Sequence, residues 1–211
     1  MQWEELYKRE RARYEDGEAR LDPEQLVRLG NVAYGAGLAL LMLRRENEAR
    51  EWFDRAARRW RESWDHATPT SWGRPIGVIK AKLLAGDEDG AAAAARWALE
   101  LGTVDAESAI GRYAACLAHS VLGCWNEARH DASTIRDRED FPPAVADALA
   151  TIAAHDVVGY AEAAEAVLES FETRDEYLED AAVADTLLVL QALAEKRGIA
   201  TELPPSPVLP A

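Results

Sequence analysis

The sequence predicts an all-α protein, an array of antiparallel helical hairpins with about nine or ten helices. Apolar residues recur at three- and four-residue spacing along most of the chain, which is the period of an amphipathic helix. No stretch alternates apolar and polar residues with β-branched enrichment for long, so strands are not expected. The breaks between helical segments are short, which makes consecutive helices antiparallel neighbours.

The N-terminal part predicts a capping helix followed by the first hairpin. We expect the capping helix over about residues 2–19, within a cap of residues 1–22. Asp22 and Pro23 then combine an N-cap residue with proline at the first helical position. Leu26, Leu29 and Ala33 continue at helical spacing, and a second helix follows the break "RREN".

A repeat appears when the breaks are aligned. The segments "LRRENEAREWFDRAA", "LAGDEDGAAAAARWA", "LGCWNEARHDASTI" and "AHDVVGYAEAAEAVL" each place a turn of about five residues before a helix that opens on a small residue. Ala49, Gly90, Ala128 and Ala163 are equivalent in this alignment, at separations of 41, 38 and 35 residues. Such a period predicts four stacked hairpins over residues 23–172, none of which buries its apolar face alone.

The C-terminal part predicts a second capping helix and a tail. We expect the helix within residues 173–198, over about 176–197, because Gly198 suits the left-handed position that ends a helix. The tail, residues 199–211, carries the prolines of "ELPPSPVLPA" and favours an extended form. The whole chain, residues 1–211, is therefore expected to be one domain.

The repeat resembles the tetratricopeptide repeat. Gly37, Ala49, Phe53 and Ala56 fall where that motif has its glycine, alanine, aromatic residue and second alanine, while the motif's leading tryptophan is missing. The resemblance implies a right-handed superhelix that binds a protein or peptide without catalysis, by analogy of fold. It also implies a concave groove lined by the first helix of each hairpin, with the positions Asn31, Tyr34, Leu38, Trp72, Ile79, Lys82, Tyr113, Leu117, Ala148 and Ile152.

The predicted groove is mostly apolar, so it should be covered. A continuous exposed apolar strip is a liability in a soluble monomer. A partner helix or peptide, a second copy of the chain, or the chain's own C-terminal helix and tail could cover it. We expect self-coverage or a homodimer in the purified protein.

The amino-acid composition limits the classes of partner and the compartment that are expected. The formal net charge of −14 repels phosphate backbones and anionic lipid, so neither nucleic acid nor a membrane is expected as a partner. No run of about 18 apolar residues exists, and the N-terminus is charged, so a cytoplasmic protein is expected. Two cysteines do not make a disulfide scaffold. The acidic, lysine-poor composition fits either adaptation to high salt or GC-rich coding; the former predicts higher thermal stability in molar potassium chloride than in dilute buffer.

The stretch "SWGRPIGVIKAK" concentrates positive charge in this acidic chain. Arg74 and Lys80 are candidates for an anion site at the start of a helix. Neither a P-loop nor a dinucleotide-binding loop fits the glycine spacing. The alternative is a helix start whose lysines extend along its polar edge to water.

No motif predicts a metal, a cofactor or catalysis. Cys116, His119 and Cys124 offer three soft ligands within nine residues, but no fourth ligand stands close by. The adjacent pairs His130–Asp131 and His155–Asp156 point about 100° apart on a helix and cannot by themselves form an orienting pair. A protein that is not an enzyme is therefore expected.

Two other functions stay open. The segment "LLVLQALAEKRGIATELPPSPVLP" resembles the C-termini of some all-helical immunity proteins that neutralise bacterial toxins, and an acidic surface could block a basic toxin. A small-ligand binder or an enzyme would need a deep pocket with convergent polar groups that the sequence does not reveal.

Overall fold

The computed structural model describes residues 3–20 and 22–211, and these form ten α-helices and no β-strand. The predicted all-α class is confirmed. The helices are α1 (Trp3–Glu18), α2 (Leu26–Met42), α3 (Glu46–Ser63), α4 (Gly73–Leu84), α5 (Glu88–Glu100), α6 (Ala109–Leu122), α7 (Trp125–Arg136), α8 (Pro143–Ala154), α9 (Val157–Glu172) and α10 (Asp185–Arg197).

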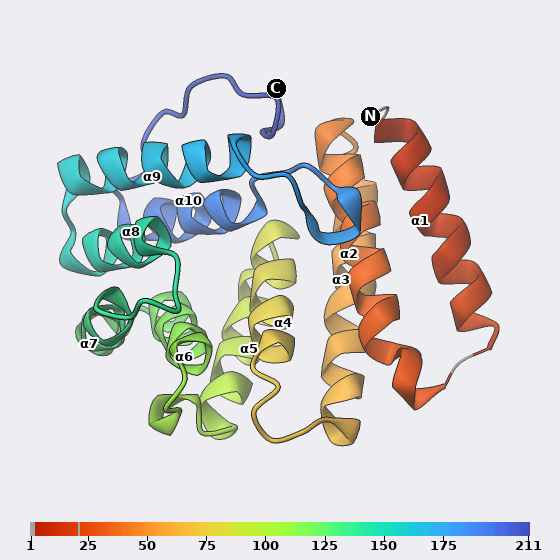
Figure 1. Cartoon of the computed structure of the whole chain (residues 1–211), viewed down its shortest axis with the longest axis horizontal. Coiled ribbons are helices and arrows are strands. Elements are labelled where there is room, and N and C mark those ends of the chain that lie inside the picture. Colours follow the sequence, from red (N-terminus) through yellow and green to blue (C-terminus); the bar gives the residue numbers. More distant parts are fainter. Residues whose placement is uncertain (1–2, 21) are drawn as a thin grey trace.

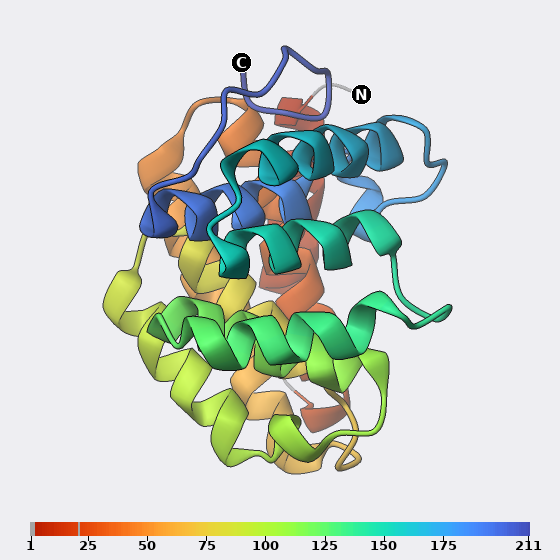
Figure 2. The same cartoon turned by 90° about the vertical axis from the view of Figure 1, so that its left-hand side faces the viewer.

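Consecutive helices are the main packing partners. From α1 to α9, each helix packs against the next one, and the chain reverses direction at each short connection (Figure 1). The second view looks from the side of α6 to α9, with the teal helices α8 and α9 above the green helices and the red α1 behind them (Figure 2). This order is compatible with the stacked hairpins that the sequence predicts.

Local signals in the sequence explain several helix ends. The Asp22 carboxylate accepts a hydrogen bond from the Glu24 N–H at 3.0 Å, in a 3-10 turn (Pro23–Gln25) that leads into α2. Asp87 and Asp156 cap α5 and α9 in the same way, by accepting from the N–H groups three residues later. Gly198 ends α10 in the left-handed region, at φ 76°, as its position in the sequence predicts.

Close packing of the first hairpin depends on Gly37. A Cβ atom added there would lie 2.7 Å from Cε1 of Phe53, a ring that is fully buried together with Ala56. Because the ring has no room to move in a filled core, only glycine lets α2 and α3 approach this closely.

Gly37→Leu is therefore expected to lower the free energy of unfolding by about 1–3 kcal/mol through overpacking. Thermal and urea unfolding would measure the change. The matched control is Gly73→Leu, since a Cβ at Gly73 meets no atom within 4 Å. Equal stability of the two variants would contradict the proposed pairing of Gly37 with Phe53.

The prediction of a C-terminal helix over residues 176–197 is wrong for its first nine residues. Residues 176–184 form a loop with one 3-10 turn (Leu178–Asp180), and Glu179 and Asp180 have positive φ values of 53° and 57°. Arg9 donates to the Asp180 carboxylate at 3.0 Å, and Arg13 donates to the Glu179 carboxylate at 2.5 Å. These ion pairs tie the loop to α1. A helix through the same residues would not place both carboxylates beside the two arginines of α1.

The C-terminal segment packs across the first helices of two hairpins. Helix α10 packs against α4, α8 and α9, and its side chains Leu187, Leu190 and Leu193 are fully buried. The tail then folds back over α9 (Figure 1). The Ala184 N–H donates to the Val208 carbonyl at 2.8 Å, and Val208 is buried. The C-terminal helix and tail therefore belong to the core of the fold.

Within residues 3–20 and 22–211, no helix combines the length and the apolar character needed to cross a bilayer.

Candidate functional site

The residues of the predicted groove do not line one open surface. Asn31 and Lys82 are partly exposed. Lys82 forms ion pairs with Asp54 at 2.7 Å and Asp87 at 2.8 Å. The other eight side chains are buried: Tyr34, Leu38, Trp72, Ile79, Tyr113, Leu117, Ala148 and Ile152. Most of the apolar strip is therefore already part of the protein interior.

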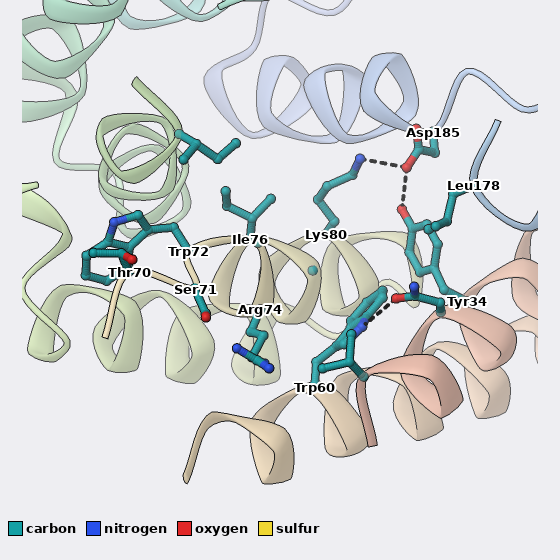
Figure 3. A pocket seen from close by; sticks show the side chains of 15 residues that line it. Tyr34, Trp60, Thr70, Ser71, Trp72, Arg74, Ile76, Lys80, Leu178 and Asp185 are labelled. Carbon is teal, nitrogen blue, oxygen red and sulfur yellow. Dashed lines mark hydrogen bonds and ion pairs between the residues drawn. The ribbon is translucent and has the colours of Figure 1, made fainter. Parts of the chain in front are cut away.

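A pocket opens beside this covered strip. It has a volume of about 500 Å³ and lies between α2, α3 and α4, with contributions from α6, the 176–184 loop and the start of α10 (Figure 3). We call it the α4 pocket. Its lining consists of Val27, Asn31, Tyr34, Trp60, Thr70, Ser71, Trp72, Gly73, Arg74, Ile76, Gly77, Lys80, Ile110, Leu178 and Asp185.

The α4 pocket joins two sets of predicted residues. Asn31, Tyr34 and Trp72 come from the predicted groove, and Arg74 and Lys80 come from the predicted anion site. The remaining groove positions lie outside its lining. Leu178 and Asp185 also line it and were not predicted, since both are far from the other residues in the sequence.

The side chain of Trp60 forms the apolar floor of the α4 pocket. It packs between α2 and α4, and each of these helices has a glycine where the indole ring touches it. A Cβ atom at Gly30 of α2 would lie 2.5 Å from the indole ring, and one at Gly77 of α4 would lie 2.7 Å from it. The indole Nε1–H donates to the Asn31 side-chain oxygen at 3.0 Å. This hydrogen bond satisfies the indole nitrogen and fixes the amide of Asn31.

A second polar group of the pocket wall is a network around Asp185. Its carboxylate accepts from the Lys80 ammonium at 2.6 Å and from the Tyr34 hydroxyl at 2.8 Å, as Figure 3 shows. Lys80 also donates to the Thr186 hydroxyl at 3.0 Å. The network joins α2, α4 and α10, so it holds the C-terminal helix on the hairpins.

The surroundings also shift the pKa values of Tyr34 and Asp185. Burial raises the pKa of the Tyr34 phenol well above its ordinary value, and the Asp185 carboxylate raises it further. For Asp185, burial acts to raise the pKa, but the Lys80 charge and the hydrogen bonds from Lys80 and Tyr34 outweigh it, so the pKa lies below the ordinary value of 3.8. The carboxylate is therefore ionised at neutral pH.

Asp185→Asn is expected to cost about 1.5–3 kcal/mol of stability at neutral pH, because hydrogen bonds to a charged group are lost. Since the folded-state pKa is depressed, this contribution is present above pH 3.8 and is lost as the pH falls through the folded-state value. Urea midpoints of the two proteins should therefore converge in acid. Asp175→Asn, at an exposed position, is the control; a difference that does not shrink below pH 3.8 would contradict the network's role.

Arg74 is the charged group of the pocket without an acidic partner. Its Nε donates to the Ser63 hydroxyl at 2.8 Å, and Ser63 in turn donates to the Trp60 carbonyl at 2.7 Å. Within the described residues, no carboxylate lies within ion-pair distance of the guanidinium, and its Nη atoms donate to no protein acceptor. Partial burial lowers the pKa of Arg74, although the group stays protonated.

A separate pair, His119 and Asp131, was missed by the sequence analysis. His119 Nδ1 lies 2.7 Å from a carboxylate oxygen of the buried Asp131, across the hairpin of α6 and α7. The two residues are 12 positions apart in the sequence and face each other from antiparallel helices. The predicted antiparallel hairpin is the signal that could have found them, since it places residues on either side of the α6–α7 turn opposite one another.

The cysteines of the same region have structural contacts. The Cys116 thiol is fully buried and donates to the Ala128 carbonyl, and burial raises its pKa far above the ordinary value. In the part of the chain that the structure describes, no three His, Cys, Asp or Glu side chains come together in a way that could hold a metal ion.

Comparison with known proteins found no relative of this chain. Neither the protein-family models, nor the curated proteins, nor the solved structures gave a significant match to the chain.

Proposed function

We propose that this chain is a non-catalytic protein- or peptide-binding helical-repeat protein of the tetratricopeptide-like kind, and that the α4 pocket takes an apolar side chain of the partner. The observation that carries the proposal is the lining of the pocket. Seven of its fifteen lining residues are aromatic or aliphatic, including Trp60, Trp72 and Ile76, and two more are glycines. Partner segments commonly anchor by inserting one such side chain into a preformed pocket.

The polar groups of the pocket favour binding over catalysis. Asn31 is bonded to Trp60, and Tyr34 and Lys80 are bonded to Asp185. A general acid or base needs a titratable group within reach of the substrate. Among the ionisable side chains of the lining, this leaves Arg74. Its guanidinium stays protonated and therefore does not transfer protons at neutral pH.

The same pairing favours a peptide over a small molecule. The volume of about 500 Å³ lies in the range of small-molecule sites. Such sites use several convergent polar groups to fix the ligand's orientation, whereas here the side chains of Tyr34, Lys80 and Asp185 bond one another and Asn31 bonds Trp60. A peptide obtains its orientation from contacts outside the pocket as well, so an apolar anchor and one polar contact suffice.

Selection from a displayed library of random peptides tests the proposal. We expect peptides that bind the wild-type protein and lose binding to Ile110→Glu, which adds a charge to the pocket at a side chain that is 45% exposed. The matched control is Val158→Glu on α9, where the side chain is 70% exposed and which contributes no residue to the pocket lining. Both exposed positions tolerate a polar residue, so loss of folding does not complicate the comparison.

Peptides that bind wild-type and Ile110→Glu equally would place the binding surface elsewhere and contradict the proposal. A screen of apolar fragments provides the other arm. If fragments bind in an Ile110-dependent way and no peptide is selected, the pocket is a small-ligand site and the peptide-binding function is wrong.

A further inference from the structure

We propose that a second surface, a groove along α10, binds one amphipathic α-helix of a partner protein, with acidic residues at the start of that helix and basic residues at its end. The groove consists of two adjoining hollows of about 310 and 490 Å³. Four residues line both hollows, so the two form one furrow that crosses the α4–α5 turn: Leu83, Gly86, Ala192 and Glu195. We call it the α10 groove. Among the described residues, it shares none of its lining with the α4 pocket.

The floor of the α10 groove is the face of α10 that the fold leaves partly exposed. Four residues of this face follow one another at three- and four-residue spacing: Leu188, Gln191, Ala192 and Glu195. The opposite face of α10 is buried in the core. Because the stripe runs over seven residues, it extends roughly 10 Å, or two helical turns. A partner segment of about the same length can therefore lie along it.

The shape and composition of the groove favour a helix over other peptide conformations. A stripe at helical spacing packs against a second helix through interlocking rows of side chains, and the small Ala192 at its centre lets that helix approach closely. The described residues form no strand, so they offer no sheet edge to an extended peptide. Grooves for proline-rich peptides are lined by aromatic residues, whereas the described lining of this groove contains none.

One end of the groove carries two arginines. Arg44 and Arg50 lie at the end beside the α2–α3 turn, and both side chains are exposed. The neighbouring Arg45 is engaged in two ion pairs, whereas Arg44 and Arg50 form none within residues 3–20 and 22–211. Glu46 lines the same end, so its formal charge is +1. In a chain of net charge −14, this end favours acidic groups of a partner.

The backbone at Arg44 supports a role for its side chain. Arg44 ends α2 in the left-handed region, at φ 60°. The corresponding residues of the next two hairpin turns are Gly86 and Gly123, and the α8–α9 turn has His155 at φ 59°. Glycine adopts this conformation without the steric cost of a Cβ atom. The chain thus places an arginine where glycine would be more favourable, which fits a function of the side chain in binding.

The other end of the groove is acidic. Asp87, Glu88 and Glu195 line it together with Lys196, a formal charge of −2. Glu88 and Glu195 are exposed and form no ion pair among the described residues, whereas Asp87 pairs with Lys82 at 2.8 Å. A helix that begins with acidic residues and ends with basic ones complements both ends when its N-terminus lies beside the arginines. The same order of charges also stabilises the partner helix through its macrodipole.

Two peptides of identical composition test the inference by fluorescence anisotropy. The first, Glu-Glu-Leu-Ala-Ala-Leu-Leu-Ala-Gln-Leu-Ala-Lys-Lys, places its leucines on one helical face between an acidic start and a basic end. The second exchanges the positions of the glutamates and the lysines. A hydrocarbon staple on the face away from the leucines keeps both peptides helical. We expect the first peptide to bind the wild-type protein about tenfold more tightly than the second, through several exposed ion pairs.

The matched variant reverses the charges of the groove. It combines Arg44→Glu, Arg50→Glu, Glu88→Lys and Glu195→Lys, which leaves the net charge at −14. All four side chains are exposed, so we expect the variant to fold, as circular dichroism would check. The charge-reversed variant should prefer the second peptide. The preference of the wild type should persist in Ile110→Glu, because Ile110 lines the α4 pocket.

Arg44→Gly separates binding from stability. We expect a melting temperature at least as high as that of the wild type, since glycine relieves the left-handed conformation, together with severalfold weaker binding of the first peptide. Arg58→Gln is the control, because Arg58 is an exposed arginine of α3 outside the groove lining, and this variant should keep the wild-type affinity.

Four results would overturn the inference. The first two are equal affinity of the two peptides for the wild type and an unchanged preference in the charge-reversed variant. The third is loss of the first peptide in Ile110→Glu, which would assign its binding to the α4 pocket. The fourth comes from sedimentation: a wild-type dimer that the charge reversal dissociates, with no binding of either peptide, would assign the groove to a second copy of the chain.

Discussion

Deletion of residues 176–211 is expected to abolish cooperative unfolding and to raise the binding of an apolar dye several-fold. The deletion removes α10, whose Leu187, Val189, Leu190 and Leu193 are fully buried. Each such side chain contributes about 1.5–3 kcal/mol by burial, and a domain has a net stability of only about 5–15 kcal/mol. The apolar faces of α4 and α8 would also become accessible to water.

The shorter deletion of residues 199–211 serves as the graded control. It removes Ile199, Val208 and Leu209 but leaves α10 and its contacts with α4. We expect a lower melting temperature and retained cooperativity. A cooperative, dye-silent monomer after deletion of residues 176–211 would contradict the packing of the C-terminal segment on the hairpins.

Trp60→Ala is expected to lower the free energy of unfolding by about 3–5 kcal/mol, as for other large buried aromatic residues. The indole is buried between α2 and α4, and its loss leaves a cavity lined by Gly30 and Gly77. Urea unfolding of the variant measures the effect. Because the ring forms the floor of the α4 pocket, peptide binding should weaken as well.

A double-mutant cycle with Gly77→Ala separates the contact from the general loss of burial. In the wild-type protein the added Cβ would lie 2.7 Å from the indole, so Gly77→Ala should destabilise. In the Trp60→Ala background the clash is gone, and alanine should stabilise α4 by up to about 1 kcal/mol through its helix propensity. The same sign of effect in both backgrounds would show that the two residues do not pack as described.

Local and repeating features of the fold could be predicted from the sequence. Helical spacing and short breaks predict the all-α class, and the repeat register assigns Gly37 and Phe53 to motif positions, which the structure brings into contact. Asp22 and Gly198 mark helix ends through interactions within a few residues. These signals are local, so a single sequence contains them.

The contacts between the C-terminal segment and the N-terminal helix could not be predicted in the same way. The loop at residues 176–184 departs from the expected helix because Glu179 and Asp180 pair with Arg9 and Arg13, which precede them by 166 to 171 residues. No local pattern signals such a pairing.

For the α4 pocket, individual residues could be predicted from the sequence, but their arrangement in space could not. Asn31, Tyr34, Trp72, Arg74 and Lys80 were candidates from the sequence. Their assembly into one pocket rests on contacts between distant segments, such as the ion pair between Lys80 and Asp185, 105 residues apart, which the sequence does not specify.

The central claim is that the α4 pocket is the binding site, and the indole N–H resonances of the seven tryptophans test it most directly. A selected peptide would be added to ¹⁵N-labelled protein while these signals are followed by NMR. The pocket predicts shifts at Trp60 and Trp72, which line it, and little change at Trp97 and Trp125, which do not. Shifts at Trp97 or Trp125, with Trp60 and Trp72 unchanged, would contradict the claim.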